Sequence, residues 1–179
     1  MATLRDTYDL AARLLNYPDK GYHDRVELWR IALGKTCPEA GAVLDTFQRG
    51  IHGLVTEELE ELYTRTFDLN PACALEVGWH LFGENYSRGE FLVKMRGEMR
   101  RLGLNESTEL PDHLAHVLAV LARLDPDQAE KFAGTFVFPA LEKILSALAD
   151  KDNPFANLLE AIRLMVAGHH APLQEVNHD

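Results

Sequence analysis

Apolar residues recur at helical spacing along almost the whole chain. Near the start, Leu4, Tyr8 and Ala11 follow i, i+4, i+7 spacing, which places them on one face of a helix. Thr3 precedes this run and Asp6 follows it by three residues, a pattern typical of a capping box. The same periodicity continues through the last third of the chain, with interruptions at Pro or Gly residues. The predicted helices span residues 4–15, 22–33, 39–52, 57–67, 72–82, 87–102, 111–121, 126–148 and 154–167.

Two places in this pattern leave room for another structure. The apolar stretch 72–82 could form a short strand, but Leu75, Trp79 and Phe82 keep the 3.6-residue period and favour a helix. Pro139 is expected to break or kink the helical stretch that contains it, because its ring clashes with the preceding turn. No alternating strand runs and no Asn-Gly hairpins are present. The sequence therefore predicts an all-α fold, a single-domain bundle of about eight helices over residues 1–179, with a flexible polar tail from 168.

Composition and charge narrow the functional classes. The chain has 179 residues and a formal net charge of −10, and such an acidic surface repels a nucleic-acid backbone. The charge could favour a basic partner segment, or it could serve solubility alone. The N-terminus lacks the apolar run of a secretory signal, and no window reaches the ~20 apolar residues of a membrane span. Cys37 and Cys73 stand outside any C-x-x-C pattern, so we expect reduced thiols in a cytoplasmic protein.

The chain carries few signs of catalysis. It has no glycine-rich phosphate loop, no G-x-S-x-G and no H-E-x-x-H. The densest group of polar side chains, between Glu109 and His116, could suggest a metal site. A helical di-iron bundle, however, needs Glu-x-x-His pairs, whereas Asp112 is the residue three positions after Glu109. His113 and His116 would diverge by roughly 60° on a helix. We therefore expect no metal site, no catalytic residue and no bound cofactor.

A structural interpretation of this segment is available beside the functional one. Pro111 would form the first helical turn, Asp112 would accept backbone N–H groups at the helix start, and His113 would hydrogen-bond locally. Residue chemistry alone favours this structural interpretation.

Three sequence blocks, taken together, favour the functional interpretation of this segment. They are Tyr63-x-x-x-Phe67-Asp68, HLFGENYSRG over residues 80–89, and ELPDHL over residues 109–114. In type and spacing they resemble the NarJ family, the nitrate reductase delta subunits or molybdenum cofactor assembly chaperones, over about residues 5–165. In the related TorD branch, proline directly follows the glutamate. Here Leu110 intervenes, which places the chain nearer NarJ.

The resemblance has two departures from the family pattern. Met99 stands where family members often have an aromatic residue, and Ala115 stands where they often have proline. Both residues are compatible with a helix, so the expected NarJ/TorD-like fold is unaffected. They weaken any inference about which client is served.

The resemblance implies a cytoplasmic chaperone without catalytic activity. Such a protein binds the N-terminal segment of the catalytic subunit of a molybdenum-containing oxidoreductase and keeps it competent for cofactor insertion. Nitrate reductase is the first candidate client, and the cofactor-insertion machinery is a second possible partner. A client segment that forms an amphipathic helix could lie in a groove between helices. The competing hypotheses are a carboxylate–histidine metalloprotein and a helical adaptor that shares only the fold.

The expected client-binding residues fall into three groups. Glu109, Asp112 and His113 form the functional loop, and His113 would titrate near neutral pH. The other two groups are groove or support residues and two methionines; the aromatic residues could equally be core, and methionines at helical spacing are more often core. Trp29 and Trp79 are expected to fill the core. The groove and support candidates are Tyr63, Phe67, Asp68, Arg88, Met95 and Met99.

Overall fold

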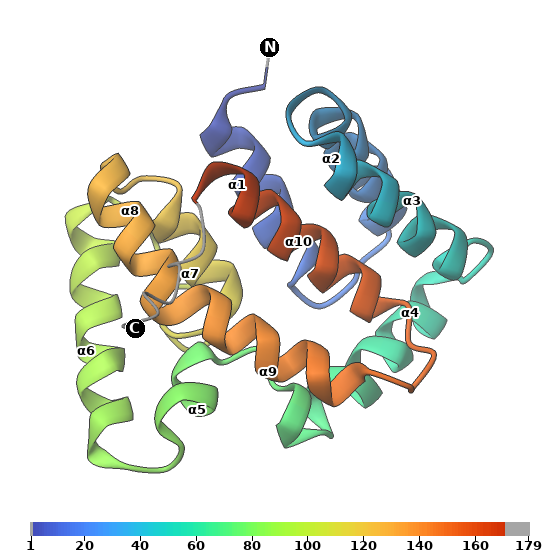
Figure 1. The fold of residues 1–179 in the computed structure, drawn as a ribbon. Coiled ribbons are helices and arrows are strands. Elements are labelled where there is room, and N and C mark those ends of the chain that lie inside the picture. Colours follow the sequence, from blue (N-terminus) through green and yellow to red (C-terminus); the bar gives the residue numbers. More distant parts are fainter. Residues whose placement is uncertain (1, 171–179) are drawn as a thin grey trace, which may run out of the picture.

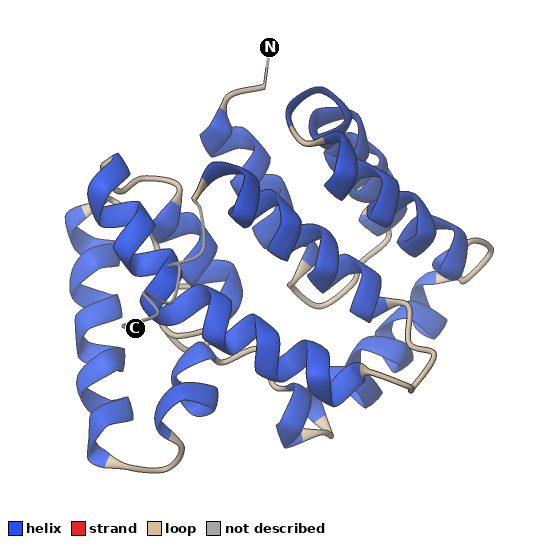
Figure 2. Ribbon diagram, in the orientation of Figure 1, coloured by secondary structure: helices blue, strands red, loops and turns tan. Residues whose placement is uncertain are grey.

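A computed structural model describes residues 2–170 of the chain, and helices joined by short loops make up this range (Figure 2). No strand occurs among the described residues, which confirms the predicted all-α class. The α-helices are α1 (Leu4–Leu14), α2 (Tyr22–Thr36), α3 (Pro38–Ile51), α4 (Thr56–Tyr63), α5 (Val77–Phe82), α6 (Tyr86–Arg101), α7 (Leu114–Leu121), α8 (Pro126–Phe132), α9 (Phe138–Leu148) and α10 (Phe155–His169). Shorter turns are η1 (Thr64–Asp68) and η3 (Ala133–Val137), both π-helical, and the 3₁₀ turn η2 (Pro71–Cys73).

The last helix occupies the centre of the molecule. α10 packs along α3 and against α9, while α1 packs against both α2 and α7 (Figure 1). α5 contacts α6 and α9, and α6 also contacts α7. Segments 60–120 residues apart in the chain are therefore neighbours, and the loop before α7 lies near η1, since residues of both line the same pocket.

Several helix ends follow the predicted chemistry. The Thr3 side chain accepts a hydrogen bond from the Asp6 backbone N–H at 3.1 Å, and the Asp6 carboxylate accepts one from the Thr3 N–H at 2.9 Å. This confirms the capping box of α1. Asp125 caps α8 through the Gln128 N–H. After α6, Gly103 adopts φ +70°, the left-handed conformation that glycine favours at a helix end.

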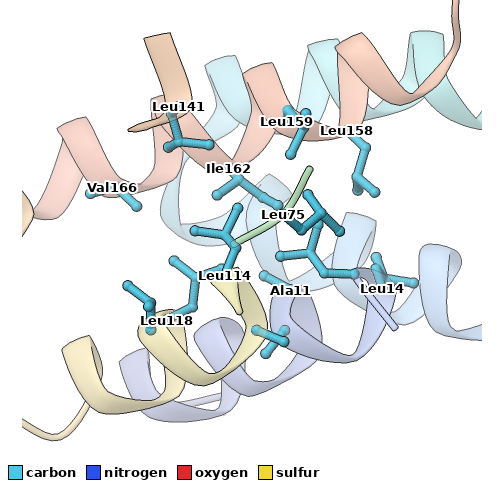
Figure 3. Packing of buried hydrophobic residues seen from close by; sticks show 14 of the residues in the cluster. Ala11, Leu14, Leu75, Leu114, Leu118, Leu141, Leu158, Leu159, Ile162 and Val166 are labelled. Atoms are coloured by element: carbon cyan, nitrogen blue, oxygen red, sulfur yellow. The ribbon is translucent and has the colours of Figure 1, made fainter. Parts of the chain in front are cut away.

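The core is one cluster of buried aliphatic and aromatic side chains that draws on most of the helices. At its centre, Leu75 and Leu114 point between α1 and α7 on one side and α9 and α10 on the other (Figure 3). Leu75 lies in a non-helical segment and Leu114 is the first residue of α7; the residues next to them, Glu76 and His113, form an isolated antiparallel β-bridge where the two segments cross. The Leu114 N–H donates to the Leu75 carbonyl at 2.8 Å. The core thus fixes the position of both loops.

The bridge explains why the apolar stretch 72–82 was only partly predicted. The expected helix is present from Val77, whereas the residues before it form η2 and the strand-like bridge. Burial of Leu75 at the molecular centre demands an extended crossing there, and helical periodicity does not reveal it. Pro139 is the second residue of α9, two positions after η3 ends, so the predicted disturbance of the helix takes the form of a π-helical turn just before it.

Other predicted helix boundaries need correction. The helix expected from Pro111 begins at Leu114, since the preceding residues form the bridge. Thr56 is the first residue of α4 rather than its cap, and the Val55 N–H is held by the Glu58 carboxylate at 3.0 Å. α2 continues past Gly34, and the α-helices number ten within 2–170. α10 reaches His169, so the predicted tail cannot begin at 168; residues 171–179 lie outside the described range.

Two further predictions concern thiols and membranes. Cys37 and Cys73 both lie within the described residues and are free cysteines, as expected. Among the helices of residues 2–170, none combines the length and apolar character that crossing a membrane would require.

Candidate functional site

A pocket of about 320 Å³ opens where η1, α5, the first turn of α6 and the loop before α7 meet. Its wall contains residues from all three sequence blocks that carry the family resemblance. Because the blocks are separated by up to 50 residues in the chain, their convergence depends on the crossing at the Glu76–His113 bridge. Six of the predicted site residues line the pocket: Tyr63, Phe67, Asp68, Arg88, Glu109 and His113.

Asp112 lies behind this wall and is completely buried. One of its carboxylate oxygens, Oδ2, accepts a hydrogen bond from Arg88 Nε at 3.2 Å, and the pair forms a salt bridge. The other oxygen, Oδ1, has no hydrogen-bond partner among the described residues. Asp112 therefore does not cap α7 as predicted; it anchors Arg88 at the pocket edge through a buried charge pair.

Close packing at Gly78 makes this pair possible. A Cβ atom at Gly78 would lie 2.7 Å from Asp112 Oδ2, 3.0 Å from Phe91 Cδ1 and 3.3 Å from Arg88 Cγ. The backbone just before Gly78 is also fixed, because the Val77 N–H donates a hydrogen bond to the Asp112 carbonyl at 2.8 Å. Only glycine at this position lets α5, α6 and the 109–113 loop approach so closely.

His113, and not Asp112 as predicted, caps the N-terminus of α7. It is 2% exposed, and its Nδ1 accepts a hydrogen bond from the Ala115 N–H at 3.1 Å. Burial, and to a lesser degree the neighbouring His116, lowers the pKa of His113 to about 4. The predicted local hydrogen bond is confirmed, but the predicted titration near neutral pH is wrong, because desolvation disfavours the charged imidazolium.

His116 is also structural. Its Nδ1 lies 2.8 Å from the Leu110 carbonyl, which can only accept, and its Nε2 lies 3.0 Å from the Ser107 hydroxyl. The imidazole thus fastens the loop that carries Glu109. Within residues 2–170, no three His, Cys, Asp or Glu side chains come together in a way that could hold a metal ion.

The aromatic side of the pocket is largely core. Tyr63 and Phe67 are 3% and 4% exposed, and their ring centroids lie 5.1 Å apart. The Tyr63 hydroxyl donates to the Leu15 carbonyl at 2.7 Å, and burial raises the pKa of this phenol. Both rings also pack against Phe155 of α10. These residues support the pocket floor and present only an edge to a ligand.

The pocket has an excess of acidic groups. Asp68, Glu76 and Glu109 line it together with one cation, Arg88, which already pairs with Asp112. Burial, followed by the nearby carboxylates of Asp112 and Glu109, raises the pKa of Glu76; burial alone raises that of Asp68. A positively charged ligand group would favour the ionised carboxylates and so lower the pKa of both Glu76 and Asp68.

Five lining residues were not among the predicted site residues, and two of them, Glu76 and Trp79, contribute polar groups to the pocket. Trp79, expected in the core, is partly exposed; its Nε1 donates to the Pro71 carbonyl at 3.0 Å, and its ring lies 6.0 Å from the Arg88 guanidinium. Glu76, between Leu75 and Val77, was not predicted as a site residue. Their position in the sequence could have indicated them, because they come shortly before the second block, which begins at His80 directly after Trp79.

Met95 and Met99 do not belong to the pocket. Both lie on the inner face of α6 and are 0% and 1% exposed, respectively. Their prediction as client-binding residues is therefore corrected: in this structure they are core side chains. The helical spacing that placed them on one face also placed that face against the rest of the protein.

Fold and pocket together define an all-α protein with an acidic and aromatic surface pocket built on a crossed-loop core. The chain matches the family described as "Nitrate reductase delta subunit" over residues 34–161, more than half its length. It belongs to that family.

Two curated relatives from Escherichia coli (strain K12) align with most of this chain. It is 29% identical over 157 residues to the nitrate reductase molybdenum cofactor assembly chaperone NarJ, covering 86% of this chain and 66% of the relative. It is 26% identical over 156 residues to the probable nitrate reductase molybdenum cofactor assembly chaperone NarW, covering 87% and 65%, respectively. The alignments thus span slightly less than two thirds of the relatives' own length.

Proposed function

We propose that this protein is a cytoplasmic assembly chaperone for a molybdenum-containing oxidoreductase, with nitrate reductase as the first candidate client. It would bind the N-terminal segment of the catalytic subunit and keep that subunit competent for cofactor insertion. The molybdenum cofactor would pass to the client and would not be a resident group of this chain. The protein would perform no catalysis of its own.

One observation carries the proposal. The three blocks that resemble the family's sequence pattern converge on a single pocket, although the chain offers many other surfaces. Membership of the family and the names of the NarJ and NarW relatives supply the client class. Residue chemistry supports peptide binding, because the pocket combines aromatic edges with carboxylates.

The charge of the pocket suggests how a peptide would bind. Three lining carboxylates face one arginine that is already paired, so a basic group on the client segment would be attracted. A pocket of about 320 Å³ holds one or two side chains, and the rest of the segment would lie across the surrounding surface. Arg88 would meanwhile offer its remaining N–H donors to peptide carbonyls.

A binding measurement tests this proposal. Fluorescence anisotropy with the labelled N-terminal peptide of a candidate catalytic subunit should give saturable binding, whereas a scrambled peptide should not. Glu109→Gln should weaken binding by about tenfold, because the variant removes a lining charge while the loop contacts of Ser107 and His116 remain. Glu57→Gln, an exposed position on α4, is the control with the same loss of charge.

Two outcomes would contradict the proposal. The first is equal binding of the native and scrambled peptides by the unmodified chain. The second is equal weakening by both glutamate variants, which would assign the effect to overall charge. Elemental analysis of the same preparation separates the metalloprotein alternative, which predicts a stoichiometric metal.

A further inference from the structure

A second, larger hollow lies on α6 and α8, away from the candidate functional site. It measures about 400 Å³ and is bounded by the C-terminal half of α6, by α8 and by η3. Leu124, Phe132 and Phe136 form its apolar floor. Phe136 packs edge-to-face against Phe132 with centroids 5.2 Å apart and at a tilt against Phe91 at 4.8 Å, so the floor is continuous with the core. We call this hollow the α6–α8 groove.

The rim of the groove is basic although the chain as a whole is acidic. Lys94 and Arg101 of α6 face Lys131 of α8 across it. Glu98 pairs with Arg101 at 2.6 Å, and Asp125 also lies close enough to raise the pKa of Arg101. The lining of the groove therefore contains three cations and one carboxylate, in a protein whose net charge is −10.

The two lysines give the groove its unbalanced charge. Neither Lys94 nor Lys131 takes part in a salt bridge with another residue of the 2–170 range. Lys94 Nζ instead lies 5.1 Å above the Phe136 ring, a cation–π contact that holds the ammonium over the apolar floor. An ammonium in this position remains able to meet a carboxylate from outside.

Both pockets are built on the same local distortion. Among the described residues, the π-helical turns are η1, which contributes Phe67 and Asp68 to the candidate site, and η3, which contributes Thr135 and Phe136 to the α6–α8 groove. Single π-helical turns inside α-helices occur frequently at functional sites, because they place side chains where a regular helix cannot. This observation is independent of charge, and it supports the interpretation of the groove as a binding surface.

We propose that the α6–α8 groove docks an acidic amphipathic helix of a partner protein. Lys94 and Arg101 are seven residues apart, which is two helical turns, or about 10 Å along α6. A partner helix lying alongside has the same rise, so carboxylates at its positions i and i+7 meet both cations. Apolar side chains between them cover the Phe132–Phe136 floor, and Lys131 flanks the helix from α8.

This docking surface is separate from the candidate functional site. The two pockets share no lining residue. Along α6, the pocket residue Arg88 and the nearest groove residue, Lys94, are separated by six positions, about 9 Å. The groove proposal therefore does not depend on the proposed client-binding site, and one can fail without the other.

A designed helical peptide tests the proposal directly. The probe is an alanine-based fluorescent peptide of about 15 residues with two glutamates two turns apart and leucines between them. The unmodified chain should bind it with an affinity that falls as salt rises. The double variant Lys94→Glu/Lys131→Glu should weaken binding by about tenfold or more. Lys20→Glu/Lys151→Glu, two exposed lysines outside the groove, changes the net charge equally and should bind as the unmodified chain does.

Three results would overturn the proposal. They are failure of the unmodified chain to bind the probe, equal binding of a probe with glutamine in place of glutamate, and equal effects of the two double variants. Circular dichroism of each variant shows whether it is folded. Because all four lysines are exposed, loss of helix content is not expected.

Discussion

Substituting Gly78 by alanine tests the packing that holds the candidate site together. Gly78 lies in α5, where a Cβ atom would come within 2.7 Å of Asp112 Oδ2 and 3.0 Å of Phe91 Cδ1. Neither neighbour can move away freely. The Asp112 side chain is fully buried and bound to Arg88, and Phe91 is 4% exposed and stacks on Phe136.

Two opposing contributions determine the expected change in stability. Glycine to alanine inside a helix normally stabilises by about 0.5–1 kcal/mol, because the unfolded chain loses freedom. Forcing a methyl group into a packed site costs about 1–3 kcal/mol, and displacing one partner of a buried ion pair adds to that cost. We expect Gly78→Ala to lower the free energy of unfolding by about 2 kcal/mol. Gly97→Ala in α6 meets no atom within 4 Å and should raise it.

Urea denaturation followed by far-ultraviolet circular dichroism measures both variants under the same conditions. The two free energies of unfolding should change in opposite directions. Gly78→Ala should also weaken binding of the client peptide, since Arg88 and the 109–113 loop must shift, whereas Gly97→Ala should leave binding unchanged. If both variants gain stability to a similar extent, the close approach at Gly78 is looser than described and the argument from packing is refuted.

Two further predictions concern the buried charges. Arg88→Met should cost about 3 kcal/mol because Asp112 loses the one salt-bridge partner it has within residues 2–170, and adding Asp112→Asn should recover part of that loss. A double-mutant cycle by urea denaturation with no coupling would refute the pairing. His113 takes up a proton near pH 6.5 when unfolded but only near pH 4 when folded. The free energy of unfolding should therefore fall by roughly 2 kcal/mol between pH 7 and pH 5. The fall should be smaller in His113→Asn, which retains a capping acceptor but cannot take up the proton. If the urea midpoints of the two proteins depend equally on pH, the assignment to His113 is contradicted.

Much of the fold was predictable because helical periodicity records which face of a segment is buried. Tyr8, Phe91, Leu118 and Ile162 each lie on a predicted apolar face and are buried. The failures occur where tertiary contacts override the local pattern. The crossing at Leu75 is apolar and compatible with a helix in sequence, and only its long-range hydrogen bonds make it extended.

The membership of the candidate pocket was predictable in part, and its geometry was not. The family resemblance identified Glu109, Arg88 and Asp68, which indeed share a pocket. It did not indicate that Asp112 lies behind the wall rather than in it, since burial of a carboxylate depends on a partner 24 residues away. The basic groove could not be recognised either, because Lys94 and Lys131 look like ordinary surface lysines until α6 and α8 are placed together.

The structural and functional interpretations of the ELPDHL segment turn out to concern different residues. Asp112 and His113 hold the loop: one pairs with Arg88, and the other caps α7 from a site that is 2% exposed. Replacing both by alanine would therefore remove a buried charge pair and a helix cap at once, and loss of client binding in that variant would not distinguish folding from recognition. Glu109 differs, because its side chain lines the pocket while Ser107 and His116 hold the loop around it. Recognition is best tested at Glu109, whose removal leaves these structural contacts in place.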